Sequence, residues 1–355
     1  MTYTNTTTEH LSILNDWIQS ISLDIGLTSD FSIQPIVGDA SLRKYYLLIP
    51  NTKNNPPQPQ FIIMQTPIDN SMKNFINIAN ILSELNLSIN VPKIFAIKST
   101  THVGYLLLSY LGENLLFKHL NLNTAESMYK IAWKALADVQ IAAKNINLPA
   151  MDRRYIKKNL LLFKTWYLKT HLNLPNMFNI NNLLNNLENY FVKVFSSQPQ
   201  VFVHVDYHSK NLILETLHLN TDSNVMGILD FQDAMLGPIT YDIASLLQDA
   251  YLIWPEDLTE KILLNYHAHL IKHKALFNLS TEQFLKYFYL TGLQRHIKNL
   301  GTFARLKYFY KKSDYVKHIP NLLNYINKTC DKFPDPELLA LKKLLTNSTC
   351  GVAEG

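Results

Sequence analysis

The chain has 355 residues and a mass of 41.0 kDa, which is enough to bury a large core and to form two lobes. Hydrophobic residues make up 47% and charged residues 17%, a balance that excludes a wholly disordered chain. The formal net charge of +5 is spread along the sequence without a Lys/Arg block, so no nucleic-acid partner is expected.

Two features bear on where the protein works. The first ten residues lack the basic and apolar regions of a signal peptide, and the longest apolar stretches, 105–111 and 160–168, are shorter than the ~20 residues that span a bilayer. Cys330 and Cys350 stand in no metal-ligand spacing. We therefore expect a cytoplasmic protein without disulfides and without membrane insertion.

The first third of the chain mixes short apolar runs with two helical patterns. Helices are expected at 9–22 and 71–85, where apolar residues recur at helical spacing. Strands are expected at 31–37, 45–49, 61–64, 91–97 and 104–110. A turn containing Gly38 follows the first strand. This order of elements is typical of the small lobe of a kinase.

After Gly112 long helical patterns dominate, and β-rich runs interrupt them at 201–203 and 225–231. Helices are expected at 124–143, 153–171, 180–195 and from 243 to about 345, followed by a loose tail. The sequence thus predicts an α+β, protein-kinase-like fold with two lobes. A nucleotide-binding lobe with its N-terminal helix covers 1–109, and a helical lobe for catalysis and substrate binding covers 110–355.

The polar residues between the two β-rich runs have the spacing that phosphoryl transfer needs. His204, Asp206 and Asn211 form an H-x-D-x-x-x-x-N loop, and Asp230 follows the second run. Such a transfer requires a carboxylate near the acceptor hydroxyl and oxygen ligands for Mg²⁺. Taken alone, Asp206 and Asn211 could equally be loop formers and His204 a core histidine.

A second signature follows in register and favours the catalytic interpretation. It runs from Asp230 through Ala234, continues with Gly237-Pro238 and ends with Asp242-Ile243-Ala244. The pattern resembles the D-x-x-x-A-x-x-G-P-x-x-x-D-x-A run of the aminoglycoside-phosphotransferase-like family. The preceding loop also resembles the catalytic loop of that family and, less closely, that of protein kinases.

The resemblance implies a role for each of these residues, with ATP and Mg²⁺ as cofactors. Asp206 resembles the catalytic aspartate, which orients the acceptor hydroxyl and receives its proton. Asn211 and Asp230 resemble the Mg²⁺ ligands, and His204 the histidine that maintains the backbone of the loop. Asp242 has two compatible interpretations: it suits the N-cap of the following helix, and it resembles the buttress that binds the loop backbone. In both cases its loss should destabilise the loop.

Further segments indicate one subgroup within this family, and the resemblance extends to about residue 325. They are 38–45, the leucines before Gly112, 161–167, 229–234, 237–242 and 294–298. Together they resemble the anomeric N-acetylmuramate/N-acetylglucosamine kinases of bacterial cell-wall recycling. The resemblance implies phosphate transfer to the C1 hydroxyl, which gives the sugar α-1-phosphate.

One position departs from the kinase pattern, because Met64 stands where the third strand usually ends in a phosphate-clamping lysine. The chain is either a nucleotide-binding pseudokinase or uses another cation, and the sugar kinases that it resembles also lack this lysine. Arg43 and Lys44 follow the glycine-containing turn, and strand alternation lets only one of them face the nucleotide. We favour Arg43 for its forked donors, although both could be solvated charges.

Backbone groups are expected to bind the rest of the nucleotide. The small residues Gly38, Ala40 and Ser41 would let N–H groups of the turn approach the phosphates. The adenine is expected at the hinge formed by Leu108, Ser109 and Tyr110.

The charge of the helical lobe bears on the acceptor. Residues 256–320 hold eleven Lys/Arg and five Asp/Glu, a balance of about +6. That balance disfavours a polycationic acceptor and suits an anionic one, such as the lactyl group of N-acetylmuramate. The candidates for binding the acceptor are Asp233, Arg153, Arg295, His296 and Arg305. Each could instead form an ordinary ion pair.

Two alternatives to an amino-sugar kinase stay open. The chain could phosphorylate another small molecule, namely an aminoglycoside, a choline-like amine or homoserine, or it could be the pseudokinase that Met64 suggests. A protein kinase is disfavoured, because nothing between Asp230 and Tyr241 resembles an activation segment. The choice between N-acetylmuramate and N-acetylglucosamine is not decided by the sequence.

Overall fold

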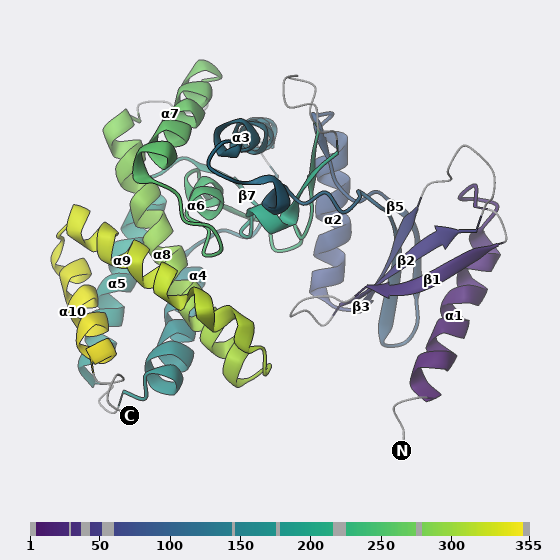
Figure 1. Ribbon diagram of the computed structural model, residues 1–355, viewed down its shortest axis with the longest axis horizontal. Helices are drawn as coiled ribbons and strands as arrows, with labels where there is room; N and C mark the ends of the chain where they lie inside the picture. Colours follow the sequence, from purple (N-terminus) through teal and green to yellow (C-terminus); the bar gives the residue numbers. More distant parts are fainter. Residues whose placement is uncertain are drawn as a thin grey trace. The chain divides into compact units, whose positions relative to one another are not determined.

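The computed structural model describes residues 5–27, 30–36, 43–51, 60–143, 146–174, 178–215, 225–274 and 279–350. The chain divides into two compact units, each described here by itself (Figure 1). The first unit comprises Met1–Asn86, Asn90–Glu113 and Gly227–Asp233. The second comprises Leu87–Ile89, Asn114–Met226 and Ala234–Gly355.

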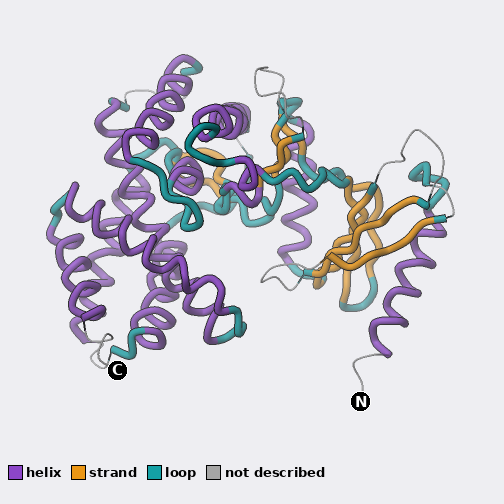
Figure 2. Tube along the Cα trace, in the orientation of Figure 1, coloured by secondary structure: helices purple, strands orange, loops and turns teal. Residues whose placement is uncertain are grey.

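The first unit is built on an antiparallel five-stranded sheet (Figure 2). In sheet order its strands are β1 (Phe31–Ile36), β2 (Lys44–Pro50), β3 (Phe61–Pro67), β6 (Val103–Ser109) and β5 (Ile94–Ser99). The register places Met64 of β3 between Tyr45 and Leu106 on the neighbouring strands. The interior of β6 is buried along its whole length, as expected for a central strand with both faces covered.

Two helices cover opposite faces of this sheet (Figure 1). Helix α1 (Asn5–Ile21) packs Trp17 and its apolar neighbours against one face, where Tyr105 of β6 meets the indole ring at 6.1 Å. Helix α2 (Asn70–Glu84) lies on the other face, with Met72 against Gly104. The Asp69 carboxylate begins α2 by accepting hydrogen bonds from the first-turn N–H groups.

The segment Gly227–Asp233 joins the first unit although it lies far along the sequence. The ring of Phe231 stacks on Phe75 of α2, with 4.8 Å between centroids and 24° between planes. Phe231 is fully buried. This aromatic contact attaches Asp230 to the unit that carries the sheet.

The second unit is mostly helical (Figure 2). Its helices are η1 (Leu116–His119), α3 (Ala125–Ala142), α4 (Arg153–Leu162), η2 (Phe163–His171), α5 (Phe178–Ser196), η3 (Ser209–Asn211), α6 (Tyr241–Leu247), α7 (Glu256–Lys272), α8 (Thr281–Tyr308), η4 (Ser313–His318), α9 (Ile319–Lys332) and α10 (Pro336–Cys350). Strands β7 (Gln200–Val203) and β10 (Met235–Pro238) pair antiparallel. Strand β8 (Leu212–Leu214) also belongs to this unit, whereas β4 (Ile89–Asn90) and β9 (Met226–Ile228) fall where the chain passes between the units.

The long helix α8 is the centre of this unit. A capping box between Ser280 and Gln283 begins it, and most of its middle is buried. Gly301 lets the helix approach the backbone of Leu162 and Phe163, since a Cβ there would lie 2.6 Å from the Phe163 nitrogen. At this contact α4 continues as the π-helix η2.

The structure departs from the expected elements at several places, the short strands β4 and β8 among them. The helix expected at 153–171 changes its hydrogen-bond pattern at Phe163, which apolar spacing does not reveal. The expected loose tail is wrong for residues 346–350, because α10 continues to Cys350 and buries Leu345. Strand β10 was not expected, and it forms because Met235–Pro238 pairs with β7. In the described part of the chain, no helix is long and apolar enough to cross a bilayer.

From the close contact at Gly301 we predict the effect of a substitution on the free energy of unfolding. Gly301→Ala should lower the free energy of unfolding by about 1–3 kcal/mol, because the added methyl group meets backbone atoms that cannot rotate away. Denaturant unfolding checks this, with Lys286→Ala on the exposed face of α8 as the control. Equal stability of the two variants would contradict the close approach.

Candidate active site

The loop between β7 and β8 holds the residues of the H-x-D-x-x-x-x-N motif. The Asn211 amide closes this loop, since its Nδ2 donates to the Asp206 carbonyl at 3.0 Å. This bond uses the nitrogen of the amide and leaves its oxygen for another partner. Ser209 is fully buried and donates to Asp249 at 3.1 Å, which anchors the far end of the loop.

Asp242 binds the start of the same loop. One carboxylate oxygen accepts the His204 N–H at 2.6 Å and the other accepts the Val205 N–H at 3.1 Å. The two bonds hold Val205 at a φ of +80°, a conformation that a β-branched residue rarely adopts. Asp242 is therefore not the N-cap of α6, a position that Thr240 occupies. Of the two expected placements, the structure has the one in which Asp242 contacts the loop backbone.

The electrostatics of Asp242 reflect its position. Its carboxyl is fully buried, and burial raises its pKa to about 7 against the opposing effect of the two N–H donors. His204 is also buried, and its ring lies edge-on to Tyr207 at 5.7 Å.

Asp206 projects from the braced loop with 39% of its side chain exposed. Its partner is Lys298 of α8, whose Nζ lies 3.5 Å from Asp206 Oδ1. Burial alone would raise the pKa of Asp206, but the surrounding positive charge, Lys298 foremost, lowers it to about 2. Asp206 is thus an ionised carboxylate that a hydroxyl group could reach.

Lys298 is a site residue that the sequence analysis missed. It lies three residues after Arg295 on α8, so the two side chains share a helix face. Arg295 is almost fully buried, and its guanidinium lies over the Tyr241 ring at 5.5 Å. Its charge acts on both Asp206 and Asp242. The i, i+3 spacing of two cations in an otherwise buried stretch was the available signal.

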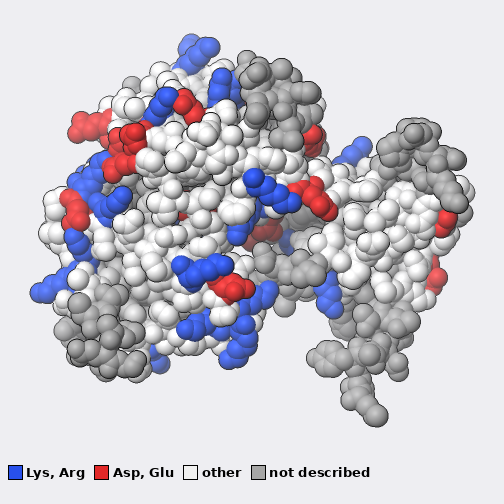
Figure 3. Space-filling view, viewed as in Figure 1, with Lys and Arg blue, Asp and Glu red and all other residues white. Residues whose placement is uncertain are grey.

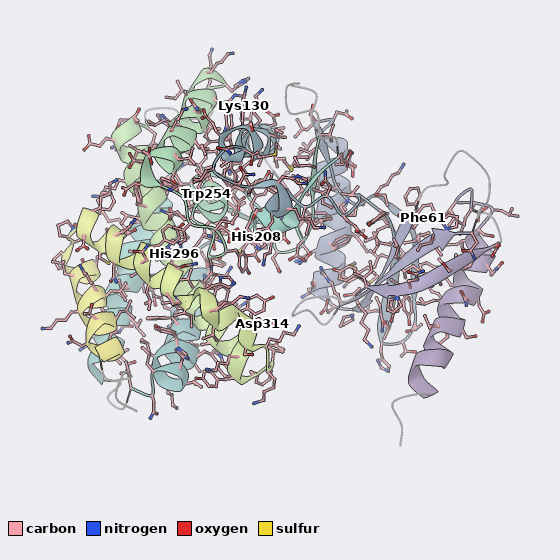
Figure 4. The ribbon with its side chains drawn as sticks, viewed as in Figure 1. Phe61, Lys130, His208, Trp254, His296 and Asp314 are labelled. Carbon is pink, nitrogen blue, oxygen red and sulfur yellow. The ribbon has the colours of Figure 1, made fainter. Side chains whose placement is uncertain are left out.

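The residues just before Asn211 pack against aromatic rings. The Lys210 ammonium lies 3.6 Å from the centroid of Tyr251 and 5.1 Å from that of Phe117. The His208 ring meets Tyr251 edge-on at 5.9 Å, and burial lowers its pKa. Figure 4 labels His208, a partly buried side chain of the second unit.

Arg43 is the buried cation of the first unit. Its Nη2 donates to Ser71 Oγ at 2.7 Å in the first turn of α2, and its guanidinium lies over the Phe75 ring at 5.6 Å. Nη1 lies 3.9 Å from Asp230 Oδ1. Lys44, the next residue, is exposed. Alternation therefore turns Arg43 inward and Lys44 outward, whereas Met64 is fully buried in the sheet.

Asp230 also has a backbone conformation that is uncommon for its residue type. Its φ is +62°, and its Oδ1 accepts a hydrogen bond from Gln232 Nε2 at 2.8 Å. Its side chain is 47% exposed. Carboxylate oxygens such as those of Asp230 are among the hard donors that Mg²⁺ prefers. Within the described ranges, no three His, Cys, Asp or Glu side chains converge as a metal site.

Of the residues that the sequence predicts to bind the nucleotide, some lie in the described structure and some do not. Gly38, Ala40 and Ser41 lie outside the described residues. At the expected hinge, the N–H groups of Ser109 and Tyr110 already donate to the carbonyls of Lys93 and Gln60. Leu108 is buried within β6. An adenine at this hinge would therefore use other backbone groups than these two N–H donors.

The acceptor candidates are dispersed. Arg153 is 53% exposed and pairs with Glu188 of α5 at 2.6 Å, and Asp233 is exposed in the first unit. His296 (Figure 4) stacks on Tyr325, and burial lowers its pKa to about 3, so its neutral ring is poorly suited to bind a carboxylate. Arg305 lies over Tyr310. Of these candidates, Arg295 is the one whose charge acts on Asp206.

Comparison with known proteins decides the family. Residues 32–279 match the model of the phosphotransferase enzyme family. The chain belongs to this family.

The relatives of this phosphotransferase cover nearly all of it. It is 30% identical to the N-acetylmuramate/N-acetylglucosamine kinase of Pseudomonas aeruginosa, over 94% of the chain and 95% of that protein. It is 27% identical to the enzyme of the same name from Neisseria meningitidis, over 94% of both. A solved structure of the ADP-bound aminoglycoside phosphotransferase APH(2'')-Ib aligns with a TM-score of 0.52 and 14% identity, covering 86% of this chain and 95% of that one. The expected kinase-like fold is confirmed.

From the hydrogen bonds of Asp242 we predict the effect of its substitution on the stability of this phosphotransferase. Asp242→Asn should lower the free energy of unfolding by about 1–3 kcal/mol, because the amide nitrogen cannot accept the second backbone N–H. Denaturant unfolding measures the change, and Asp257→Asn, at an exposed position of α7, is the control. A variant as stable as the control would contradict the bracing of the loop.

Proposed function

We propose that this phosphotransferase moves the γ-phosphoryl group of ATP onto the anomeric hydroxyl of an N-acetylated amino sugar. The observation that carries the proposal is the partly exposed, ionised Asp206 carboxylate on a loop braced by Asn211 and Asp242. The acceptor class is supported by the names of the two relatives, which match over nearly the whole chain. The product would be the sugar α-1-phosphate, an intermediate suited to peptidoglycan recycling.

In the proposed reaction, Asp206 accepts a hydrogen bond from the C1 hydroxyl and orients its oxygen toward the γ-phosphorus. The new bond forms between the C1 oxygen and that phosphorus, and the bond to the β–γ bridging oxygen breaks. ADP leaves, and the hydroxyl proton passes to an Asp206 carboxylate oxygen. Such transfers depend on positioning and on charge stabilisation more than on covalent chemistry, which fits a rigidly held loop.

The same proposal assigns the metal and phosphate contacts. The Asn211 amide oxygen and the Asp230 carboxylate would hold Mg²⁺, which neutralises phosphate charge when bound. Arg43 would bind the nucleotide phosphates in place of the lysine that Met64 replaces. Its support is that Ser71 and Phe75 fix the guanidinium beside Asp230. A cation fixed in this way argues for a working nucleotide site and against the pseudokinase alternative.

Charge favours an anionic or neutral sugar over an aminoglycoside. The charges of Lys298 and Arg295 both act on Asp206, and a polycationic acceptor would meet repulsion there. Other lysines of the second unit lie at its surface, such as Lys261, which pairs with Glu126 at 2.7 Å. Figure 3 shows Lys and Arg interspersed with Asp and Glu over the visible face of this unit.

The decisive test is the position of the transferred phosphate. Phosphorus NMR of a reaction with ATP, Mg²⁺ and N-acetylmuramate or N-acetylglucosamine should show an acid-labile 1-phosphate. Asp206→Asn should lower kcat about 10²–10⁴-fold, because the base at the acceptor hydroxyl is lost. Reactions without Mg²⁺ and with an aminoglycoside as acceptor are the controls. An acid-stable 6-phosphate, or turnover of the aminoglycoside alone, would refute the proposed acceptor.

The adjacent residues Arg43 and Lys44 provide a matched test of the proposed contact between Arg43 and the ATP phosphates. Arg43→Ala should raise KM for ATP or lower kcat by about tenfold or more, because a cation held beside the metal ligand is lost. Lys44→Ala should change either constant less than about twofold, because an exposed charge contributes little. Steady-state kinetics with varied ATP decide between them. If the two variants behave alike, the role assigned to Arg43 is wrong.

A further inference from the structure

Lys298 has an environment unlike that of the surface lysines of the second unit. It lies in the middle of α8 with 17% of its side chain exposed, and its Nζ is 3.5 Å from Asp206 Oδ1. A surface lysine such as Lys261 keeps 60% of its side chain exposed in its ion pair. Removing an ammonium group from water is costly, so a half-buried lysine needs a compensating anion.

The positive charge around Asp206 exceeds what one carboxylate balances. Arg295 lies one turn before Lys298 on the same face of α8, and its Nε has no hydrogen-bond partner among the described residues. Asp242, the other carboxyl group nearby, already binds two backbone N–H groups. Next to the two cations, the hydroxyls of Tyr155 and Tyr241 bind each other at 2.6 Å. The surplus charge suits the arrival of an anionic group at Asp206.

We propose that Lys298 is a catalytic residue that donates a hydrogen bond to an oxygen of the phosphoryl group while it is being transferred. The inference rests on the proposed function, since it takes Asp206 as the group that binds the acceptor hydroxyl. Lys298 stays protonated throughout. It stabilises the charge on the equatorial phosphoryl oxygens, while the C1 oxygen–phosphorus bond forms, the bond to ADP breaks and the proton passes to Asp206.

Distance selects the phosphoryl group over the acceptor carboxylate as the partner of Lys298. The oxygen that Asp206 orients is the atom that becomes bonded to phosphorus, so the equatorial phosphoryl oxygens lie two bonds away from it. An ammonium group 3.5 Å from the Asp206 carboxylate is within reach of those oxygens. The lactyl group of N-acetylmuramate is attached at C3, two ring carbons away from the reacting C1. Lys298 would therefore contact the phosphoryl group, which is the same whichever sugar accepts it.

The kinetic test compares Lys298→Met with Lys298→Arg, using both N-acetylmuramate and N-acetylglucosamine. Lys298→Met should lower kcat about 10²–10³-fold for both sugars, as expected when one donor to the transition state is lost. Lys298→Arg should recover part of that loss because it keeps the charge. Lys286→Met, the same change at an exposed position of α8, is the control and should match the wild type. A rise in KM for N-acetylmuramate alone would overturn the proposal in favour of a carboxylate contact.

A binding experiment tests the role of Lys298 without any acceptor sugar. The wild type should bind Mg²⁺·ADP more tightly when aluminium fluoride is present, because the fluoride complex mimics the transferring group. Lys298→Met should lose about tenfold or more of that gain and keep its affinity for Mg²⁺·ADP alone, as measured by calorimetry. An undiminished gain in this variant overturns the role of Lys298. If the wild type phosphorylates neither sugar, the proposed function fails, and this measurement still decides on Lys298.

Discussion

The pair of hydrogen bonds from Asp242 to the backbone of His204 and Val205 is the constraint on which the rest of the site depends. They hold a β-branched residue at a positive φ, so the backbone turns sharply just before Asp206. These bonds offset the strain of that conformation at the residue next to Asp206. The bond from Asn211 to the Asp206 carbonyl then fixes the loop from its other side.

The fold was largely predictable because the sequence patterns were local. Apolar alternation predicted the strands of the sheet, and helical spacing predicted α1, α2 and most of the second unit. The family was predictable because two motifs stand in register, and the match over residues 32–279 confirms it. Strand β10 was missed because it depends on pairing with the distant strand β7. The π-helix was missed because apolar spacing does not distinguish it from an α-helix.

The site was predictable in part. The Asn211 amide closes the loop onto the Asp206 carbonyl five residues before it, a contact within the motif itself. Asp242 reaches the loop backbone from a second motif farther along the chain. Lys298 was not foreseen, since ninety-odd residues separate it from Asp206 and only packing of α8 brings them together. The attachment of Asp230 to the sheet unit depends on the stack of Phe231 on Phe75, which no spacing rule indicates. The roles of these residues remain predictions.

The close packing of α8 has a consequence for how the chain can vary in length. A helix turns by about 100° per residue, so one residue inserted between the Gly301 contact and Lys298 would rotate the ammonium away from Asp206. Relatives that keep both contacts must therefore place their insertions and deletions outside the stretch from Lys298 to Gly301. The helical backbone between Gly301 and Lys298 thus fixes the spacing and rotation of these two contacts. Insertions and deletions are better tolerated in the loops that connect α8 to its neighbours.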